Sequence, residues 1–265
     1  MPETVELKSR RIKRYGWVPD LPDARDFMFA APEEVLSKLP TQVDLRPQCP
    51  PVYDQGQLGS CTANAIGAAF EFDQIKEELT DFTPSRLFIY YNERQIEGTV
   101  GQDSGAMIRD GIKSVNQLGV CPEDLWAYDI SRFTEKPPQQ AYTQASLHQA
   151  TVYRRVSPVL RQIQGALAAG IPVVFGFSVY ESFESQDVAN TGIVPLPLRS
   201  ERLLGGHAVV AVGYDDTSQR FIVRNSWGSG WGMGGYCTMP YAYLTDRSLA
   251  SDFWAIYAVE KPTQA

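Results

Sequence analysis

The sequence predicts an α+β protein in which a helical part precedes an antiparallel β part. Apolar residues recur at three- and four-residue spacing in the first half, whereas strand-like runs rich in Val, Ile, Phe and Tyr alternate with glycine-rich turns after Gly170. With 265 residues, 43% of them hydrophobic and 11% aromatic, the chain can bury a large core. We expect a main domain over 39–265, helical over about 50–150 and β-rich over about 151–265.

Three helices and four strands account for this prediction. The run SCTANAIGAAFEFDQIKEE predicts a mostly buried helix with Ser60 as N-cap and Cys61 in its first turn. Further helices are expected over DSGAMIRDGIKSVNQLG and SPVLRQIQGALAAG, each ending at a glycine. Strands are expected in IPVVFGFSV, GGHAVVAVGYDD, QRFIVRNSWG and GYCTMPY, with turns at DDTSQ and GSGWGMGG.

Residues 1–38 differ from the rest of the chain. The stretch RYGWVPDLPDARDFMFAAPEE mixes prolines, aspartates and aromatic residues without helical or strand periodicity, which predicts extended chain. Tyr15, Trp17 and Phe27 give it more aromatic surface than a solvated tail requires. We therefore expect this segment to lie against a protein surface.

Charge and hydropathy exclude several classes of partner. A formal net charge of -7 leaves no overall positive field, and the basic cluster KSRRIKR at residues 8–14 is interpreted as a solvated end, so we expect no nucleic-acid partner. No run approaches the roughly 18 apolar residues of a membrane span. The first fifteen residues lack the apolar region of a secretory signal, which favours a cytoplasmic protein or one exported by another route.

The cysteines and histidines argue against a metal site. Only two histidines are present, and the cysteines show neither a C-x-x-C pair nor the spacing of zinc ligands. We expect no cofactor, and most of the cysteines to be free thiols. They are Cys49, Cys61, Cys121 and Cys237.

Cys61 stands where a thiol can act as a nucleophile. It follows the glycine-rich turn QGQLGS at the predicted start of a helix. The N–H groups and dipole of a helix N-terminus favour a thiolate over a thiol, and a neighbouring imidazolium favours it further. The second condition requires a histidine.

His207 is the better candidate for that histidine. His148 lies in the polar stretch QASLHQA and is expected at the surface, whereas His207 follows two glycines at the start of a β-rich run. Asn225 comes eighteen residues later, at the end of the next predicted strand, so a hairpin would bring its amide to the imidazole. Singly, each residue has a structural explanation; together they form the nucleophile, base and orienting group of an acyl-transfer site.

These residues resemble the papain family of cysteine peptidases, from about Leu39 to the C-terminus. The matching motifs are VDLRP at 43–47, the glutamine at 55, GSC at 59–61, the histidine before AVVAVGY and the asparagine in NSWGSGWG. The resemblance implies a two-lobed fold, with a helical lobe and a β-barrel-like lobe on either side of an active-site cleft.

The resemblance also implies roles for individual residues. Cys61, His207 and Asn225 would be catalytic, and Gln55 would stabilise the oxyanion. Trp227 would cover the histidine and asparagine pair and line the leaving-group side of the cleft. Gly59, Gly105 and Gly206 would border the substrate.

Two positions depart from the family motif. The usual CGSCW is LGSCT here, so Leu58 replaces a disulfide cysteine and Thr62 replaces an aromatic residue. The first change implies a reducing compartment or a divergent, for instance bacterial, branch. The second alters the packing of the helix and hence the shape of the cleft.

The function implied by the resemblance is peptide hydrolysis through a thioester, with peptides or proteins as substrates and an apolar side chain two residues before the cut. Relatives carry longer inhibitory prosegments, which leads to the hypothesis that residues 1–38 lie in or beside the cleft and restrain activity; the alternative is that they only brace the domain. Two other functions stay open, a Cys-His amidase or transamidase and a non-catalytic binding module on the same fold.

Overall fold

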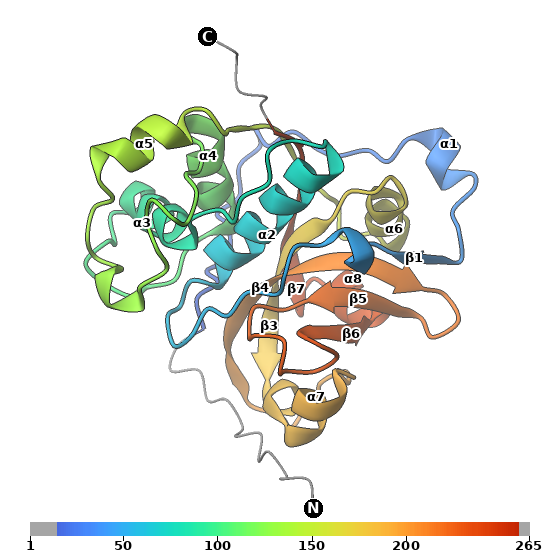
Figure 1. Cartoon of the computed structure of the whole chain (residues 1–265). Coiled ribbons are helices and arrows are strands. Elements are labelled where there is room, and N and C mark those ends of the chain that lie inside the picture. The colour runs from blue at the N-terminus through green and yellow to red at the C-terminus, as the bar shows by residue number, and fades with distance from the viewer. Residues whose placement is uncertain (1–14, 260–265) are drawn as a thin grey trace, which may run out of the picture.

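The computed structural model of the chain describes residues 15–259, which form a helical lobe and a lobe built on a β-sheet (Figure 1). The basic cluster at residues 8–14, expected to be a solvated end, lies outside the described residues. The helical lobe holds α2 (Cys61–Lys76), α3 (Arg86–Glu97), α4 (Ile108–Leu118), the 3-10 helix η2 (Ile130–Arg132) and α5 (Gln139–Ala145).

The second lobe is an antiparallel sheet whose main path runs β2-β7-β3-β4-β5-β6, with β1 paired to β4. Its strands are β1 (Gln42–Asp44), β2 (Ala150–Arg155), β3 (Val173–Tyr180), β4 (Leu203–Asp215), β5 (Arg220–Arg224), β6 (Tyr236–Pro240) and β7 (Ala250–Val259). The expected α+β class is confirmed, but the barrel-like closure is not found, because β2 and β6, at the two ends of the strand order, do not pair with each other.

Short helices surround the sheet. They are α1 (Glu33–Leu36), η1 (Arg46–Gln48), α6 (Leu160–Ala168), η3 (Glu181–Glu184), α7 (Gln186–Thr191) and α8 (Tyr241–Thr245). None of the described helices is both long and apolar enough to cross a membrane.

The predicted helices form, but two begin later than expected. The third begins at Leu160 and not at Ser157, because Val156 still bonds to Phe253 and so prolongs the pairing of β2 with β7. The second begins at Ile108, because the preceding Ala106 is bonded to the N-terminal segment. Both delays arise from tertiary contacts that a local pattern does not contain.

Helix α2 lies between the lobes and positions Cys61. It packs against α3 and α4 on one side and against β4 and β7 on the other, and 14 of its residues are buried. Ser60 is the N-cap as predicted, although its hydroxyl contacts Tyr128 and Asn64 instead of capping the helix. Because α2 is covered on both sides, its apolar residues need not be confined to one stripe, and small residues can occupy its surface all round.

The N-terminal segment enters between the lobes, as expected of a chain that lies against a surface. The N–H of Trp17 donates to the carbonyl of Gly206 at 3.0 Å, and the N–H of Val18 donates to the carbonyl of Ala106 at 3.0 Å. Because Gly206 belongs to β4 and Ala106 precedes α4, the segment is held by both lobes. We call residues 15–38 the arm.

Candidate active site

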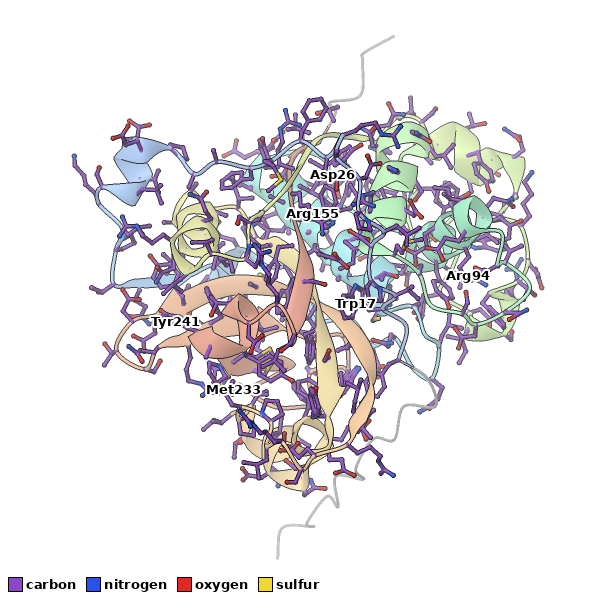
Figure 2. All side chains as sticks on the ribbon, turned by 180° about the vertical axis from the view of Figure 1, so that it is seen from behind. Trp17, Asp26, Arg94, Arg155, Met233 and Tyr241 are labelled. Carbon is purple, nitrogen blue, oxygen red and sulfur yellow. The ribbon has the colours of Figure 1, made fainter. Side chains whose placement is uncertain are left out.

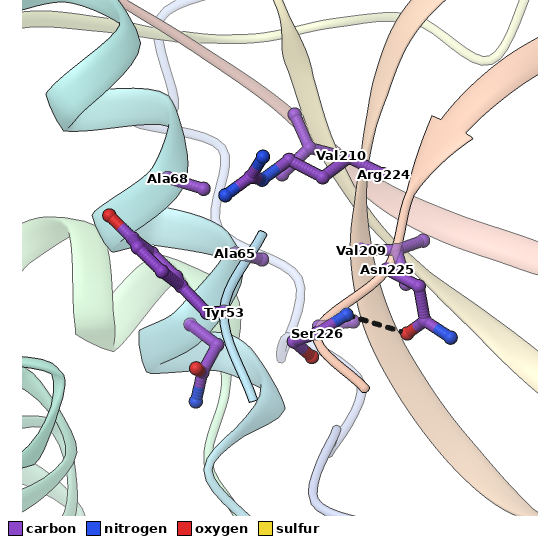
Figure 3. A pocket seen from close by; sticks show the side chains of 10 residues that line it. Tyr53, Ala65, Ala68, Val209, Val210, Arg224, Asn225 and Ser226 are labelled. Carbon is purple, nitrogen blue, oxygen red and sulfur yellow. Dashed lines mark hydrogen bonds between the residues drawn. The ribbon is translucent and has the colours of Figure 1, made fainter. Parts of the chain in front are cut away.

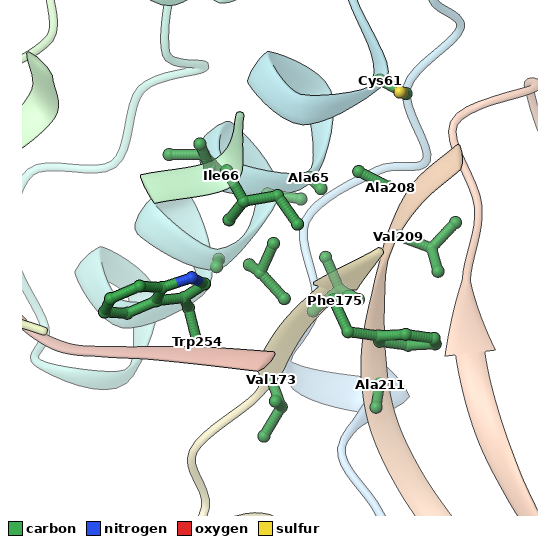
Figure 4. Close-up of a cluster of buried hydrophobic side chains, with 14 of the residues drawn as sticks. Cys61, Ala65, Ile66, Val173, Phe175, Ala208, Val209, Ala211 and Trp254 are labelled. Carbon is green, nitrogen blue, oxygen red and sulfur yellow. The ribbon is translucent and has the colours of Figure 1, made fainter. Parts of the chain in front are cut away.

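Cys61 is the first residue of α2 and is fully buried, close to Ala208 on β4 (Figure 4). Burial raises the pKa of its thiol to about 12, against the opposing effect of hydrogen bonds from the backbone N–H groups of Ala208 and Gly16. The expected lowering by the helix N-terminus is therefore outweighed in this arrangement, because a charge cannot be solvated here. The thiol is neutral while the arm is in place.

His207 lies next to Ala208 and is 1% exposed. Its Nε2 is 2.8 Å from Oδ1 of Asn225, and its Nδ1 has no hydrogen-bond partner among the described residues. Because the amide oxygen can only accept, the neutral ring carries its proton on Nε2, which leaves the lone pair of Nδ1 free. Burial lowers the pKa of His207 to about 4, although the bond to Asn225 opposes the shift.

Aromatic rings enclose the imidazole. The ring centroid of Trp227 is 5.1 Å from that of His207, with an interplanar angle of 31°, and Phe177 packs edge-on at 5.7 Å. Phe183 contacts both His207 and Trp227. The rings exclude water from the pair of His207 and Asn225, which strengthens their hydrogen bond.

Gln55 is buried beside the same pair. Its Nε2 donates to the carbonyl of Leu58 at 2.9 Å, and its Oε1 accepts from the hydroxyl of Ser226 at 2.6 Å. The two bonds fix the amide with its N–H groups toward the loop that carries Cys61. The sequence analysis missed Ser226, although its place directly after Asn225 could have suggested it.

A small cavity underlies this region, between α2, β4 and the segment 224–226 that follows on from β5 (Figure 3). Tyr53 and Ala65 line it from one side, and Val209, Asn225 and Ser226 from the other. It lies at the interface between the two lobes.

The three glycines predicted to border the cleft all contact the arm. A Cβ at Gly105 would overlap the carbonyl of Gly16, and one at Gly206 would come 2.6 Å from Cε3 of Trp17. In turn, a Cβ at Gly16 would overlap the carbonyl oxygen of Gly59. Only glycine at these positions lets the arm pass so close to the surface that carries Cys61.

Beside Gly105, the residue that exchanges backbone hydrogen bonds with the arm is its neighbour Ala106. The N–H of Ala106 donates to the carbonyl of Gly16 at 2.8 Å, and its carbonyl accepts from Val18. This bridge between Trp17 and Ala106 is parallel. Gly105, with a φ of 72°, instead provides the turn and the space that bring the two chains together.

Tyr15 covers the other side of the site. Its hydroxyl donates to Glu184 in η3, and its ring centroid is 6.1 Å from that of His207. Burial and the bond to Glu184 raise the pKa of Tyr15 far above its usual range. Tyr15 therefore seals the site as a neutral phenol.

The remaining histidine and cysteines lie outside this cluster. His148 is half-buried against Phe82, with ring centroids 4.7 Å apart, and is thus less exposed than predicted. Cys49, Cys121 and Cys237 are free, as is Cys61. Among residues 15–259, no group of three or more His, Cys, Asp and Glu side chains is arranged to hold a metal ion.

Known cysteine proteases resemble this chain in sequence and in fold. The family model described as papain family cysteine protease matches residues 39–252. The crystal structure of xylellain, a cysteine protease from Xylella fastidiosa, is similar with a TM-score of 0.88 and 46% identity, over 96% of this chain and 98% of that chain.

Curated sequences are also similar. An uncharacterized peptidase C1-like protein from Acanthamoeba polyphaga mimivirus is 45% identical over 275 residues, covering 94% of this chain and 88% of that protein. Cathepsin B-like CP1 from Giardia intestinalis is 29% identical over 240 residues, covering 85% of this chain and 76% of that protein.

Proposed function

Because the chain belongs to the papain family of cysteine proteases, which hydrolyse peptide bonds, we propose that Cys61 is its nucleophile, His207 its general acid and base, and Asn225 the group that orients the imidazole. The observation that carries the proposal is the state of His207. Its Nε2 is bonded to Asn225, while its Nδ1 is free and the neighbouring N–H of Ala208 bonds the sulfur of Cys61.

The reaction follows from this arrangement. Nδ1 of His207 takes the thiol proton, and the Cys61 thiolate attacks the peptide carbonyl carbon. The resulting oxyanion accepts hydrogen bonds from the Gln55 amide and the Cys61 N–H. His207 then gives its proton to the leaving amine, which breaks the C–N bond and leaves a thioester. Water, deprotonated by His207, attacks the thioester and releases the acid and the thiol.

The arm keeps the enzyme inactive in this proposal, and residues 1–38 act as a short prosegment. Gly16 and Trp17 fill the space bordered by Gly59, Gly105 and Gly206, where a substrate would lie. The burial that raises the pKa of Cys61 comes in part from this contact, since the Gly16 N–H itself bonds the sulfur. Departure of the arm would admit water and substrate together.

The direction of the arm explains how it can occupy the cleft without being cut. His207 must protonate the leaving amine, so the carboxyl-terminal part of a substrate has to lie on the side of His207 and Trp227. In the arm, it is the amino-terminal end that lies on this side, because Tyr15 packs beside His207 and the later residues follow from it. The arm thus runs opposite to a substrate and does not present its peptide groups in the reactive orientation.

A thiol titrant tests the proposal. We would measure, by intact mass, the rate at which an epoxysuccinyl reagent labels the full chain and its Gly16→Ala variant, whose added methyl group cannot fit against Gly59. The expected result is one label, at Cys61, gained faster by the variant. Gly101→Ala is the matched control, because a Cβ at Gly101 meets nothing within 4 Å.

Other outcomes would point elsewhere. Equal rates for Gly16→Ala and the unaltered chain would mean that the arm only braces the domain. Labelling that survives in Cys61→Ala would place the reactive thiol at another cysteine. Transfer of the acyl group to an added amine, in place of hydrolysis, would favour the amidase or transamidase alternative.

A further inference from the structure

Beyond the cleft, a carboxylate of the arm contacts two arginines of the folded domain. We call residues 39–259, to which these arginines belong, the body. Asp26 accepts two hydrogen bonds from Arg109 of α4, from Nε at 3.0 Å and from Nη2 at 2.5 Å. It accepts a third from Nη1 of Arg155, at the end of β2, at 3.1 Å. Asp26 and Arg155 lie together at the back of the molecule (Figure 2).

The two arginines are held in place by the folded domain. Their guanidinium groups lie over the ring of Trp254, with Cζ to centroid distances of 5.7 Å for Arg109 and 5.5 Å for Arg155. The side chain of Arg109 is only 5% exposed. Guanidinium groups stacked on an aromatic ring and carried by a helix and a strand form a rigid site for a bidentate carboxylate.

With the arm in place, three carboxylates form ion pairs with the two arginines, and two of the three, Asp20 and Asp26, belong to the arm. Asp252 is the one carboxylate of the body that forms an ion pair with these arginines among residues 15–259, with Nη2 of Arg155 at 2.8 Å. It lies where β7 bulges opposite Phe175, with a φ of 56° that turns its side chain toward Arg155. Without Asp20 and Asp26, two cations would face a single anion, and Arg109 would lack an ion-pair partner.

We propose that Arg109 and Arg155 form an anchoring site for one acidic side chain of the substrate, which the arm occupies through Asp26. This inference rests on the proposed function, in which the arm leaves before a substrate binds. One carboxylate restores the balance with Asp252, and the bidentate geometry accepts Asp or Glu in preference to their amides. The substrates are then peptides with an acidic residue at a fixed distance from the cut.

The acidic residue must lie on the amino-terminal side of the cut. Trp17 and the residues after it extend away from His207, toward the acyl side of the cleft, and Asp26 is further along the same path. A substrate that runs opposite to the arm therefore places its upstream residues at Arg109 and Arg155. The site lies well beyond the residues that contact the scissile bond.

The test is a set of internally quenched peptides cleaved by the full-length Gly16→Ala protein. In each pair of peptides an Asp or an Asn is moved one residue at a time upstream of the same cleavage site, and the ratio of the two kcat/KM values is measured. We expect a ratio of about ten at one or two positions, the size of a hydrogen-bonded charge, and a smaller ratio at high salt. Because both peptides of a pair meet the same fraction of protein from which the arm has left, the ratio does not depend on that fraction.

Variants assign the effect to the site. Arg109→Gln in the same background should bring the ratio to about one, whereas Arg132→Gln, on a surface arginine paired with Glu135, should leave it unchanged. A ratio near one at every position, measured with both arginines present, would overturn the proposal. This holds even if Arg109→Gln loosens the arm, because the arginines would then bind only the arm and not the substrate.

Binding gives a readout that needs no chemistry. The affinities of peptides with the same sequences, each carrying a fluorophore and no quencher, for the Cys61→Ala, Gly16→Ala protein should show the same preference for Asp when measured by anisotropy. If no peptide is cleaved but Asp peptides bind more tightly through Arg109, the anchoring site stands and the proposed peptidase function fails. Cleavage of all peptides with equal binding would support the function and overturn the anchoring site.

Discussion

The indole ring of Trp17 lies flat against Gly176, in the space that a side chain on β3 would occupy. A Cβ at Gly176 would overlap Cε2, Nε1 and Cδ2 of the ring. Gly176 pairs with Ala208 on β4 and with Ser251 on β7, so the ring covers three adjacent strands beside the histidine. Trp17 is 9% exposed and is the most deeply buried aromatic side chain of the arm together with Phe29.

Trp17→Ala should therefore open the cleft. Loss of a buried tryptophan removes about 3 kcal/mol of contact, which corresponds to a gain on the order of a hundred-fold in the open fraction and in the rate of thiol labelling. Phe27→Ala is the matched control, because Phe27 is an arm aromatic with 70% of its surface exposed. Equal labelling of the two variants would show that Trp17 does not hold the arm.

The arm should also dock more weakly as the pH rises through about 6. Burial, and then repulsion by Asp252, raise the pKa of Asp20 to about 6, although hydrogen bonds from Arg109 and Trp254 oppose the shift. A carboxyl with a raised pKa in the docked state favours docking when protonated, below its docked pKa. That contribution is lost when the carboxyl ionises, so the open fraction should increase between about pH 4 and 7.

The measurement compares labelling rates of Asp20→Asn and the unaltered chain across this range, because the ratio cancels the intrinsic reactivity of the thiol. The ratio should change with pH and level off above and below the window. A ratio that is constant with pH would mean that the ionisation of Asp20 does not govern docking. An open fraction that increases toward acid pH would reverse the predicted sign.

Local patterns in the sequence picked out residues that the structure brings together, but not their environment. Cys61 at a helix start and His207 after two glycines in a β-rich run are both local features, although β4 begins four residues before His207, and the hairpin prediction linked Asn225 to His207. The pKa of Cys61 is raised and not lowered as predicted, and the cause is not local. Burial by Gly16 and by the opposite lobe outweighs the helix N-terminus at Cys61, and no spacing within the helix encodes that contact.

The missed elements have similar causes. The sequence analysis did not predict β7 or β2, because β7 combines the polar start ASD with a buried apolar run, and β2 follows the helical lobe as the half-exposed ATVYRR. The position of β2 is fixed by its pairing with β7, and that of β7 by its pairing with both β2 and β3. Tyr15 and Trp17 contact the surface of the domain as predicted, whereas Phe27 is 70% exposed. The carboxylates that meet Arg109 and Arg155 carry no local signal, since each is an ordinary loop residue in the sequence.

Ser226→Ala should lower kcat with little change in KM. The hydroxyl of Ser226 holds Oε1 of Gln55, so in the proposed reaction its loss frees the amide to rotate away from the oxyanion while substrate contacts stay intact. We expect a loss of about ten-fold, smaller than the roughly hundred-fold expected of Gln55→Ala, which removes the donor itself. These rates are measured in the Gly16→Ala background, and an increase in KM alone would contradict the positioning role.

Glu93 gives a prediction about stability that concerns the replaced aromatic residue of the family motif. Its carboxyl is fully buried, and Oε1 accepts a hydrogen bond from Thr62 at 2.6 Å, one residue after Cys61. Burial raises the pKa of Glu93 well above its usual range, because it disfavours the charged carboxylate. Glu93→Gln keeps the shape and an acceptor for Thr62, and should change the free energy of unfolding by less than about 1 kcal/mol.

Glu93→Ala should behave differently, because it leaves a cavity and an unpaired hydroxyl at Thr62, next to Cys61. We expect a loss of about 2–4 kcal/mol in the free energy of unfolding, measured by urea denaturation. Comparing Glu93→Gln with Glu93→Ala separates the contribution of the side chain's shape from that of its charge. If Glu93 were ionised in the native protein, Glu93→Gln would remove a buried charge and stabilise the chain markedly at pH 7, and the urea midpoint would rise instead of staying unchanged.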